Sequence, residues 1–219
     1  KKGVIKKELL RQPLAKDELL VKAHYSGISY GTEKIVFDSH VPTNQYKFMR
    51  APHQVGEFNK EVKYGYLSVG KVIDGPNDML NKMVYTMFPH QSIYVIKSTL
   101  VTLIPKHIPI RRALLTANME TAINAMWDSK PSIGDKVYVV GAGIVGILMA
   151  YVLSSTFGIN VTVIDSDKNK KKLCEFFNID FENSMDCIEN PDIIYECSGN
   201  ISVLSELINN STLETKICI

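Results

Sequence analysis

Cysteine is scarce in this 219-residue chain, and none of it occurs in the first 173 residues. The four cysteines, Cys174, Cys187, Cys197 and Cys218, all lie in the last quarter, and no two of them have the C-x-x-C spacing of a redox or zinc motif. A disulfide framework is therefore not the basis of the fold. We expect reduced, mostly structural thiols in a cytoplasmic protein.

The chain also lacks an excess of charge of either sign. Its formal net charge at pH 7 is +2, from 25 basic and 23 acidic side chains. This balance does not call for nucleic acid or an anionic membrane as a partner. The charged N-terminus has no apolar segment of the signal-peptide type. The length fits one large or two ordinary soluble domains.

One uncharged run, residues 137–153, raises the alternative of a membrane helix. Three glycines interrupt the run, and the helical part after them is too short to cross about 30 Å of hydrocarbon. A buried parallel strand followed by a buried helix explains the lack of charge without a membrane. We therefore expect no membrane-spanning segment.

The strongest motif lies in residues 135–165. A buried-type strand at 137–140 is followed by G-x-G-x-x-G, an apolar helix at 144–153 and a second strand at 161–164. The motif glycines are Gly141, Gly143 and Gly146. In this context they allow a tight turn, the approach of a pyrophosphate to bare backbone, and close helix–strand packing. The helix start at Ile144 and Val145 offers N–H groups and a partial positive charge to that pyrophosphate. We therefore predict a Rossmann dinucleotide site.

The residue after the second strand predicts which dinucleotide binds. Asp165 lies nineteen residues after Gly146, where a Rossmann site has the acid that binds the ribose of NAD. The 2′-phosphate of NADP would meet this carboxylate at a cost of about 1 kcal/mol in water and several in a shielded site. Asp167 adds acid, whereas Lys168 and the lysines after it are the counterargument. We predict NAD, with NADP less favoured.

The rest of the chain shows two different patterns of expected secondary structure. Residues 1–110 favour an all-β domain, with strands expected at 18–25, 69–73, 82–88, 92–96 and 100–104. Within them, residues 32–63 lack a clear period, and we expect a long, partly ordered loop over a site. Residues 111–219 favour an α/β domain, with helices at 111–127, 144–153 and 201–208, an amphipathic helix after Asp165, and strands at 137–140, 161–164, 192–197 and 215–219. We therefore predict a small barrel or sandwich followed by a doubly wound parallel sheet.

An all-β domain followed by a Rossmann domain resembles the medium-chain dehydrogenase/reductase family over the whole chain. SGISYGTE at 26–33 is similar to a family segment that reads Gly-x-Cys-x-Ser/Thr-Asp, and VKYGYLSVGKV at 62–72 to one that reads Gly-His-Glu-x-x-Gly. With MRAP, PHQ, ANMETA and VGAGIVG, these phrases most resemble the zinc-lacking branch near the bacteriochlorophyllide hydroxyethyl dehydrogenases. The resemblance implies a GroES-like catalytic domain at 1–110 and a Rossmann domain at 111–219. It also implies a family member roughly a hundred residues longer, so the C-terminal part is expected to be missing and the sheet incomplete.

The resemblance implies that no zinc is bound. The family's catalytic ligand positions fall on Ser29, Tyr66, Leu67 and, for the third ligand, near Thr116 or Ala117. Zinc prefers thiolate, imidazole or carboxylate in a tetrahedral set, and these residues supply none of them. The family's four-cysteine structural zinc lobe is absent as well, because no cysteine precedes Cys174.

Without zinc, a hydrogen-bond donor must polarise the substrate oxygen while the nicotinamide carries the hydride. Tyr66 and Tyr30 are the candidates, because they fall in or beside the vacated ligand positions; for Tyr66, an aromatic plug in the metal site is an equal alternative. Thr32 and Glu33 match the family's Ser/Thr–Asp pair, whose hydroxyl relays a proton. For Glu33 a structural carboxylate is the stronger alternative, and for His90 a structural histidine.

Three further residues are candidates for cofactor contacts. Thr121 falls where a family threonine approaches the nicotinamide ring. Ser198 and Gly199 end a strand at the carboxyl edge of the sheet, where ligands bind in such folds. Cys197, beside them, is expected to be an inert buried thiol.

The sequence thus predicts a zinc-independent, NAD-linked oxidoreductase that interconverts an alcohol and a carbonyl on a small organic substrate. One alternative is an NADPH-dependent quinone or enoyl reductase, which would reduce a conjugated double bond. Another is a dinucleotide-binding protein without catalysis, which would keep the glycines and lose the ligands. The resemblance implies a homodimer.

Overall fold

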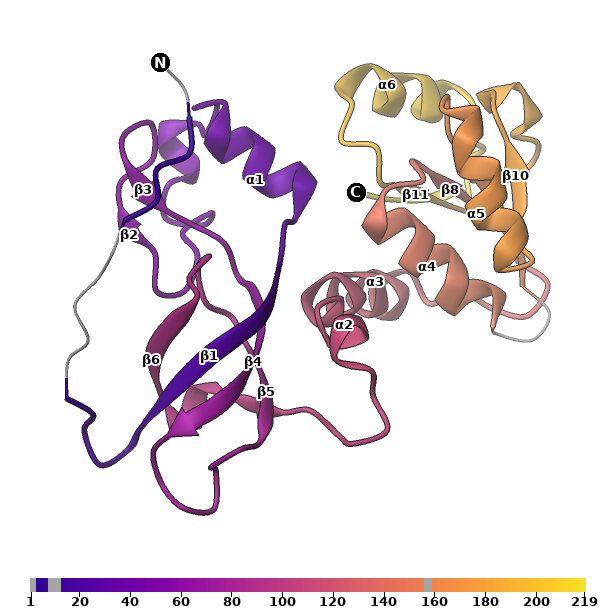
Figure 1. The fold of residues 1–219 in the computed structure, drawn as a ribbon. Coiled ribbons are helices and arrows are strands. Elements are labelled where there is room, and N and C mark those ends of the chain that lie inside the picture. Colours follow the sequence, from indigo (N-terminus) through magenta and orange to yellow (C-terminus); the bar gives the residue numbers. More distant parts are fainter. Residues whose placement is uncertain (1–2, 8–12, 156–158) are drawn as a thin grey trace. The chain divides into compact units, whose positions relative to one another are not determined.

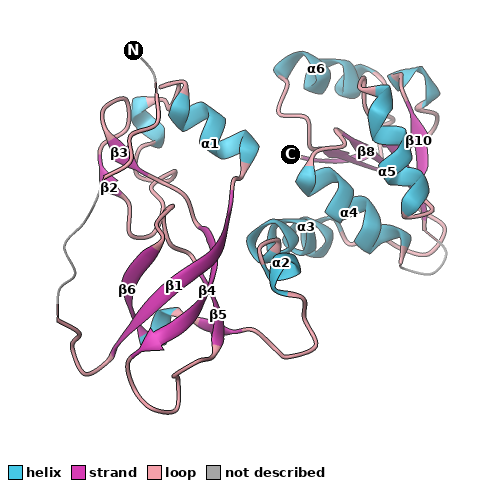
Figure 2. Ribbon diagram, in the orientation of Figure 1, coloured by secondary structure: helices cyan, strands magenta, loops and turns pink. Residues whose placement is uncertain are grey.

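The computed structural model describes residues 3–7, 13–155 and 159–219. The chain forms two compact units, Lys1–Thr116 and Ala117–Ile219. Figure 1 traces the chain through them, and Figure 2 distinguishes their helices from their strands. Each unit has its own sheet and its own hydrophobic core.

The first unit is built on a five-stranded antiparallel sheet with the order β6-β1-β4-β5-β7. Its strands are β1 (Glu18–Gly27), β4 (Leu67–Asp74), β5 (Met83–Thr86), β6 (Ile93–Lys97) and β7 (Thr102–Leu103). Leu19 and Val21 of β1 point with Val72 and Val84 into one apolar core, as the period of two in a strand requires. β1 lies between β6 and β4, and its end at Gly27 leads into the segment that holds the candidate site.

Residues 32–63 are not the loop that the sequence predicts. They contain most of α1 (Tyr30–Phe37), the 3₁₀ turn η1 (Thr43–Gln45) and the short paired strands β2 (Val55–Gly56) and β3 (Val62–Lys63). The aromatics that show no period along the chain come together in space. Phe58 and Tyr64 pack with Val36 of α1 in a separate small core.

Two other predicted boundaries differ from the structure. The helix expected at 111–127 is two helices, α2 (Ile110–Ala113) and α3 (Thr116–Ser129), and the Thr116 hydroxyl donates to the Ala113 carbonyl at 2.7 Å at the break between them. The strand expected at 100–104 shrinks to β7, because residues 98–100 form the 3₁₀ turn η2 (Ser98–Leu100).

The second unit is a parallel sheet with the order β10-β9-β8-β11-β12. Its strands are β8 (Lys136–Val140), β9 (Asn160–Ile164), β10 (Asp180–Glu182), β11 (Ile193–Glu196) and β12 (Lys216–Cys218). In chain order this is 3-2-1-4-5, the doubly wound pattern of a Rossmann fold. The order reverses between β8 and β11, and a dinucleotide binds at such a switch point.

Helices cover both faces of this parallel sheet. Val137 and Val139 of β8 pack with α3, α4 (Ile144–Ser154) and α5 (Lys171–Phe176), whereas Tyr138 and Val140 pack with α6 (Ile201–Asn209). Alternation along β8 thus sends successive side chains into two separate cores. The 3₁₀ turns η3 (Lys168–Lys170) and η4 (Met185–Cys187) complete the described elements. Among the described residues, no helix has the length and apolarity needed to cross a membrane.

Candidate active site

The glycine motif forms the turn between β8 and α4. Gly141 has φ +104°, and a Cβ on it would lie 2.6 Å from the Ser198 amide nitrogen. A Cβ on Gly146 would overlap the carbonyl oxygen of Gly141. Both positions therefore require glycine, the first for its backbone conformation and the second for the close approach of α4 to the turn.

Gly143 differs from its two neighbours, because a Cβ on it would meet no protein atom within 4 Å. It is the N-cap of α4, and no side chain accepts a hydrogen bond from the first turn of that helix. Ile144 and Val145 begin the helix, so their N–H groups have no partner within it. A helix start with free N–H groups favours an anion, and the open position beside Gly143 is consistent with the predicted phosphate site.

Asp165 follows β9 and is hydrogen-bonded to the glycine turn. One carboxylate oxygen accepts the Ala142 amide at 2.7 Å, and the other accepts the Asp167 amide at 2.8 Å. Each oxygen can accept a second hydrogen bond. The structure thus places the predicted ribose-binding acid beside the predicted phosphate-binding turn, with acceptor capacity left for ribose hydroxyls.

Ser198 and Gly199 lie at the same turn, but their amides are already engaged. The Glu196 carboxylate accepts both amides, at 2.7 and 3.3 Å, and also the Ser198 hydroxyl. Cys197 lies just beyond the end of β11, and burial raises the pKa of its thiol to about 12. The thiol is therefore protonated at neutral pH, as an inert cysteine should be.

α3 carries one predicted contact residue and one that the sequence does not single out. Thr121 is exposed, and its hydroxyl donates to the Ala117 carbonyl of its own helix at 3.1 Å. Asn118 is 7% exposed, and its Oδ1 has no hydrogen-bond partner in the described part of the chain. A buried oxygen without a donor costs free energy, and Asn118 is therefore a further candidate for a ligand contact.

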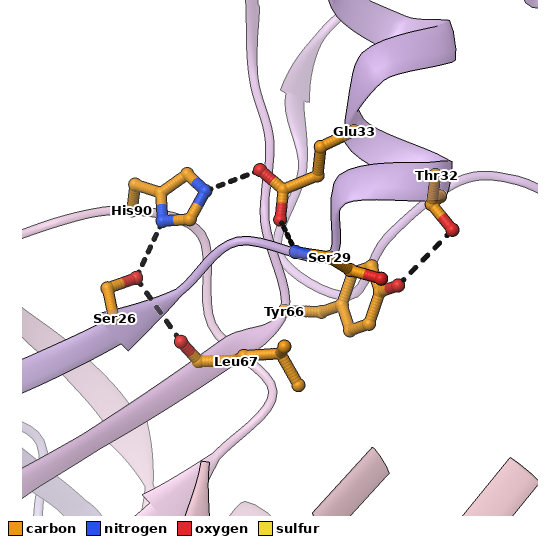
Figure 3. Close-up of polar contacts among 7 residues, drawn as sticks. All are labelled: Ser26, Ser29, Thr32, Glu33, Tyr66, Leu67 and His90. Atoms are coloured by element: carbon orange, nitrogen blue, oxygen red, sulfur yellow. Dashed lines mark hydrogen bonds and ion pairs between the residues drawn. The ribbon is translucent and has the colours of Figure 1, made fainter. Parts of the chain in front are cut away.

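The candidate chemistry residues of the first unit gather around the start of α1 (Figure 3). Tyr66 is half-buried, and its hydroxyl donates to the Thr32 hydroxyl at 3.4 Å. That distance exceeds the usual range for two hydroxyls, so the bond is weak. Tyr30, on the first turn of α1, is 69% exposed. The structure thus pairs Tyr66 with Thr32 and leaves Tyr30 facing solvent.

Glu33 fixes the N-terminus of α1 and also reaches a histidine. Its Oε1 accepts the Ser29 amide at 2.9 Å, and its Oε2 accepts from Nε2 of His90 at 2.6 Å. Nδ1 of His90 lies 2.6 Å from the Ser26 hydroxyl (Figure 3). Sequence reasoning treats His90 as structural and gives Ser26 no role, because the partners are 57 and 64 residues apart along the chain and no local spacing links them.

The residues at the family's zinc positions do not fit zinc. Ser29 is buried and offers a hydroxyl, Tyr66 a phenol, and Leu67 an aliphatic chain. Over the described ranges, no group of three or more histidine, cysteine or acidic side chains is placed to hold a metal. A thiolate, imidazole or carboxylate set is what zinc requires.

Burial shifts the acid–base behaviour of three neighbouring side chains. Burial, followed by the nearby Tyr66 and Glu33, raises the pKa of Tyr64 to about 12. Burial lowers the pKa of Lys63, whose ammonium donates to Gln91 at 2.9 Å and lies 5.4 Å from the centroid of the Phe88 ring. Burial and the charge of Lys63 lower the pKa of His53.

The sequence matches no model of a known protein family and no curated protein. Solved structures are similar in fold. Galactitol-1-phosphate dehydrogenase from Escherichia coli has a TM-score of 0.74 and 15% identity, over 97% of this chain and 70% of that one. The quinone oxidoreductase from Thermus thermophilus, also solved in complex with NADPH, has a TM-score of 0.73 and 14% identity, over 96% and 68%.

Acetophenone reductase from Geotrichum candidum NBRC 4597, solved in complex with NAD, is similar at a TM-score of 0.73 and 13% identity, over 95% of this chain and 72% of that one. At these identities the similarity establishes the fold. The predicted fold class, an antiparallel GroES-like β domain followed by a Rossmann domain, is confirmed. The chain therefore has the fold of these dehydrogenases and reductases.

Proposed function

We propose that this protein is a zinc-independent, NAD-linked oxidoreductase of the medium-chain dehydrogenase/reductase type, which interconverts an alcohol and a carbonyl on a small organic substrate. The observation that carries the proposal is the hydrogen bond of 2.7 Å from the Ala142 amide to the Asp165 carboxylate. This bond lies at the switch point of a doubly wound parallel sheet. The bond holds the carboxylate proposed to accept the ribose hydroxyls next to the turn proposed to bind the phosphates. The similar fold of solved dehydrogenases and reductases supports the proposal.

The second unit binds the cofactor in this proposal. The amides at Ile144 and Val145 would hold the pyrophosphate beside Gly143, which has no Cβ. Asp165 accepts the ribose hydroxyls. Ser198 and Gly199 border the turn next to Gly141. We assign Thr121 to the nicotinamide end.

The first unit supplies the polar groups for the substrate. A bound nicotinamide provides hydride chemistry. In carbonyl reduction Tyr66 donates its hydroxyl proton to the substrate oxygen, and Thr32, which lies 3.4 Å from the Tyr66 hydroxyl, passes a proton from solvent back to the Tyr66 oxygen. Glu33 holds the start of α1 through the Ser29 amide and so positions Thr32. Tyr30, exposed on the same turn, is assigned to substrate contact.

The zinc-lacking branch is part of the proposal, and the donor set supports it. Ser29 and Tyr66 occupy the positions at which the family resemblance places ligands, and their oxygens are poor ligands for zinc. Polarisation of the substrate oxygen then depends on hydrogen bonding. We propose the branch near the bacteriochlorophyllide hydroxyethyl dehydrogenases, because the short motifs of this chain resemble theirs.

Two alternatives remain. An NADPH-dependent quinone or enoyl reductase is favoured by the similarity in fold to the quinone oxidoreductase from Thermus thermophilus. Asp165 opposes it, because a 2′-phosphate would face its carboxylate. A non-catalytic dinucleotide-binding protein fits the glycine turn equally well. Turnover with a substrate is what separates that alternative from an enzyme.

The proposal extends to the organisation of the chain. We assign residues 1–110 to the GroES-like catalytic domain and 111–219 to the cofactor domain. We propose a homodimer from the family resemblance and, since the four cysteines are free thiols, a location in the reducing cytoplasm.

The test is cofactor reduction by the purified protein with a panel of primary, secondary and ring-linked alcohols. NAD reduction that depends on an alcohol supports the proposal. NADPH oxidation with quinones or enones, and no reaction with alcohols, would favour the reductase. NAD binding without turnover across both panels would favour the non-catalytic protein.

A further inference from the structure

Three side chains of the first unit are joined in series by two short hydrogen bonds. The Ser26 hydroxyl lies 2.6 Å from Nδ1 of His90, and Nε2 of His90 lies 2.6 Å from Oε2 of Glu33. Figure 3 shows the imidazole between the serine and the carboxylate. A hydroxyl, an imidazole and a carboxylate in this order are the elements of an activated nucleophile.

The proton positions follow from the partners. An ionised carboxylate only accepts, so Nε2 of His90 carries a hydrogen and donates it to Glu33. In the neutral ring Nδ1 is then an acceptor, and the Ser26 hydroxyl donates to it. When the ring gains a proton at Nδ1, the Ser26 oxygen accepts, and its own hydrogen is directed to the Leu67 carbonyl at 3.2 Å. The same three side chains and the Leu67 carbonyl can therefore hydrogen-bond either the neutral or the protonated His90 ring without a shift of any heavy atom.

The imidazole is held in place from several sides. The His90 amide donates to the Tyr64 carbonyl at 3.1 Å. Gly65 has φ +114°, and a Cβ on it would lie 2.8 Å from Nε2 of His90. The ring therefore lies against bare backbone at Gly65, where any other residue would displace it. Ser26 is fixed by its position in β1, opposite Ser68 of β4. The nucleophile is thus held on β1, and the base lies in the segment before β6, where the Tyr64 carbonyl and the Gly65 backbone hold it in place.

Exposure decreases along the series in the order that nucleophilic chemistry requires. Ser26 is exposed, the His90 side chain is 38% exposed, and the Glu33 side chain is 13% exposed. A shielded carboxylate interacts strongly with the imidazolium that forms during proton transfer. An open serine is accessible to an incoming electrophile.

We propose that Ser26, His90 and Glu33 form a nucleophilic centre that accepts acyl groups from activated carboxylic esters at Ser26. The Ser26 oxygen bonds to the ester carbonyl carbon while its proton passes to Nδ1 of His90. The ester C–O bond then breaks, the leaving oxygen takes that proton, and acyl-Ser26 remains. Water, deprotonated by His90, hydrolyses the acyl group to a carboxylic acid and restores the hydroxyl. In the usual serine triad Nε2 of the histidine faces the serine and Nδ1 faces the carboxylate. Here Nδ1 faces Ser26 and Nε2 faces Glu33, and the ring still acts as the base between them.

This centre does not rest on the proposed oxidoreductase function. Neither a dinucleotide nor the Tyr66 hydroxyl takes part in acyl transfer. His90 and Glu33 act through Ser26 as base and positioning residue, and their contribution must appear in the reactivity of Ser26 itself.

The experiment treats the full chain with a fluorophosphonate probe, which labels activated serines irreversibly, and maps the adduct by mass spectrometry. We expect one adduct per chain, at Ser26. His90→Gln should lower the rate constant for labelling by at least about a hundredfold, the scale of losing a general base. Glu33→Gln should lower it as well. His24→Gln is the matched control: it removes an exposed histidine of the same strand and should leave the rate unchanged.

A second readout separates a base from a structural histidine. In His90→Ala, added imidazole should restore part of the labelling rate, and p-nitrophenyl acetate should acylate Ser26 in the parent but not in Ser26→Ala. A parent chain with unlabelled Ser26, or labelling that is equal in the His90 variants, would overturn the proposal. NAD binding measured on the same sample keeps the two proposals apart, because a chain that binds NAD with an inert Ser26 refutes only the nucleophilic centre.

Discussion

Tyr66 is the residue on which the chemistry of the proposed reaction depends. Its hydroxyl donates a hydrogen bond to the Thr32 hydroxyl, and at 3.4 Å that bond is longer than usual for two hydroxyls. Little free energy is lost when such a hydroxyl turns towards a substrate oxygen. Tyr64, in contrast, is held by a 2.7 Å bond to the Met49 carbonyl inside the small core. The two adjacent tyrosines therefore differ in role, one available and one structural.

Tyr66→Phe removes the hydroxyl and keeps the ring that packs against Tyr64. We expect turnover of the alcohol to fall by roughly ten- to a thousandfold, the scale of losing one donor to a developing oxyanion. NAD affinity, measured by calorimetry, should not change. Tyr46→Phe is a suitable control, because its hydroxyl only accepts from Asn59. Full activity in Tyr66→Phe would assign this residue to packing.

Sequence patterns predicted some contacts of the candidate site and missed others for a physical reason. Gly141, Gly146 and Asp165 belong to one strand–helix–strand unit, and their spacing along the chain reflects their geometry directly. Ser26, Glu33 and His90 come from β1, α1 and the segment before β6, which only the folded sheet brings together. No period or motif connects them, so their contact is a tertiary property. Whether the predicted residues perform catalysis is a question for the variants.

At the scale of elements, two glycines at the start of α4 have different roles: one is needed for packing and the other is assigned to cofactor binding. Gly146→Ala would place a methyl group on the Gly141 carbonyl, whereas Gly143→Ala would place one in open space. We expect Gly146→Ala to lower the free energy of unfolding by about 1–3 kcal/mol, the usual cost of overpacking. Gly143→Ala should melt at the parent temperature and bind NAD at least about tenfold more weakly, a loss of about 1.4 kcal/mol.

Thermal melts and calorimetry on both glycine variants decide this prediction. Each variant is the control for the other, because both add one methyl group within four residues. Normal NAD binding by Gly143→Ala would contradict the assignment of the open space to the pyrophosphate.

The segment before β2 should make stability depend on pH. His53 has φ +56° and stacks on Phe88 with 4.8 Å between ring centroids, and burial, followed by Lys63, lowers its pKa. The unfolded chain therefore binds this proton first as the pH falls, so the stabilisation is complete above the unfolded pKa of about 6.5 and is lost below it.

We expect the free energy of unfolding to decrease between about pH 7.5 and pH 5.5, the range around the ordinary histidine pKa. Asn tolerates the left-handed backbone at position 53, and His53→Asn should therefore flatten part of this slope. Denaturant titrations at several pH values measure it. Parallel slopes in the parent and His53→Asn would contradict a lowered pKa of His53.

The missed helix α1 shows where sequence patterns fail at the element scale. Its eight residues bury only Val36, so no apolar stripe of period 3.6 is visible. Its stability comes from elsewhere: Glu33 bonds the Ser29 amide, Lys34 pairs with Asp38, and Val36 joins Phe58 and Tyr64 in the small core. The parallel sheet was predictable, because its buried strands are continuous apolar runs.

At the scale of the whole molecule, the account predicts a metal-free protein. Purified chain should contain far less than one zinc per molecule, and a chelator should change neither its melting temperature nor its activity. The reason is the donor set, in which Ser29 and Tyr66 offer oxygens that bind zinc poorly. Elemental analysis is the measurement. About one tightly held zinc per chain would contradict the zinc-independent mechanism.

The cofactor preference is the most direct consequence of the fold and the site together. A parallel sheet with the order 3-2-1-4-5 provides the switch point, the glycine turn provides the phosphate site, and Asp165 stands where the ribose of the adenosine half would bind. NAD gives that carboxylate two hydroxyls, whereas NADP brings a phosphate of the same charge. The lysines at 168 and 170–172 follow Asp165 along the chain, on η3 and α5, and we expect the Asp165 carboxylate to be the group that meets the ribose.

Calorimetric titration of the unmodified protein with NAD and with NADP therefore tests the central claim most directly. The account predicts that NAD binds at least about tenfold more tightly, a difference of about 1.4 kcal/mol, and that Asp165→Ala loses most of this preference. Equal affinity for the two cofactors, or binding of neither, would contradict it.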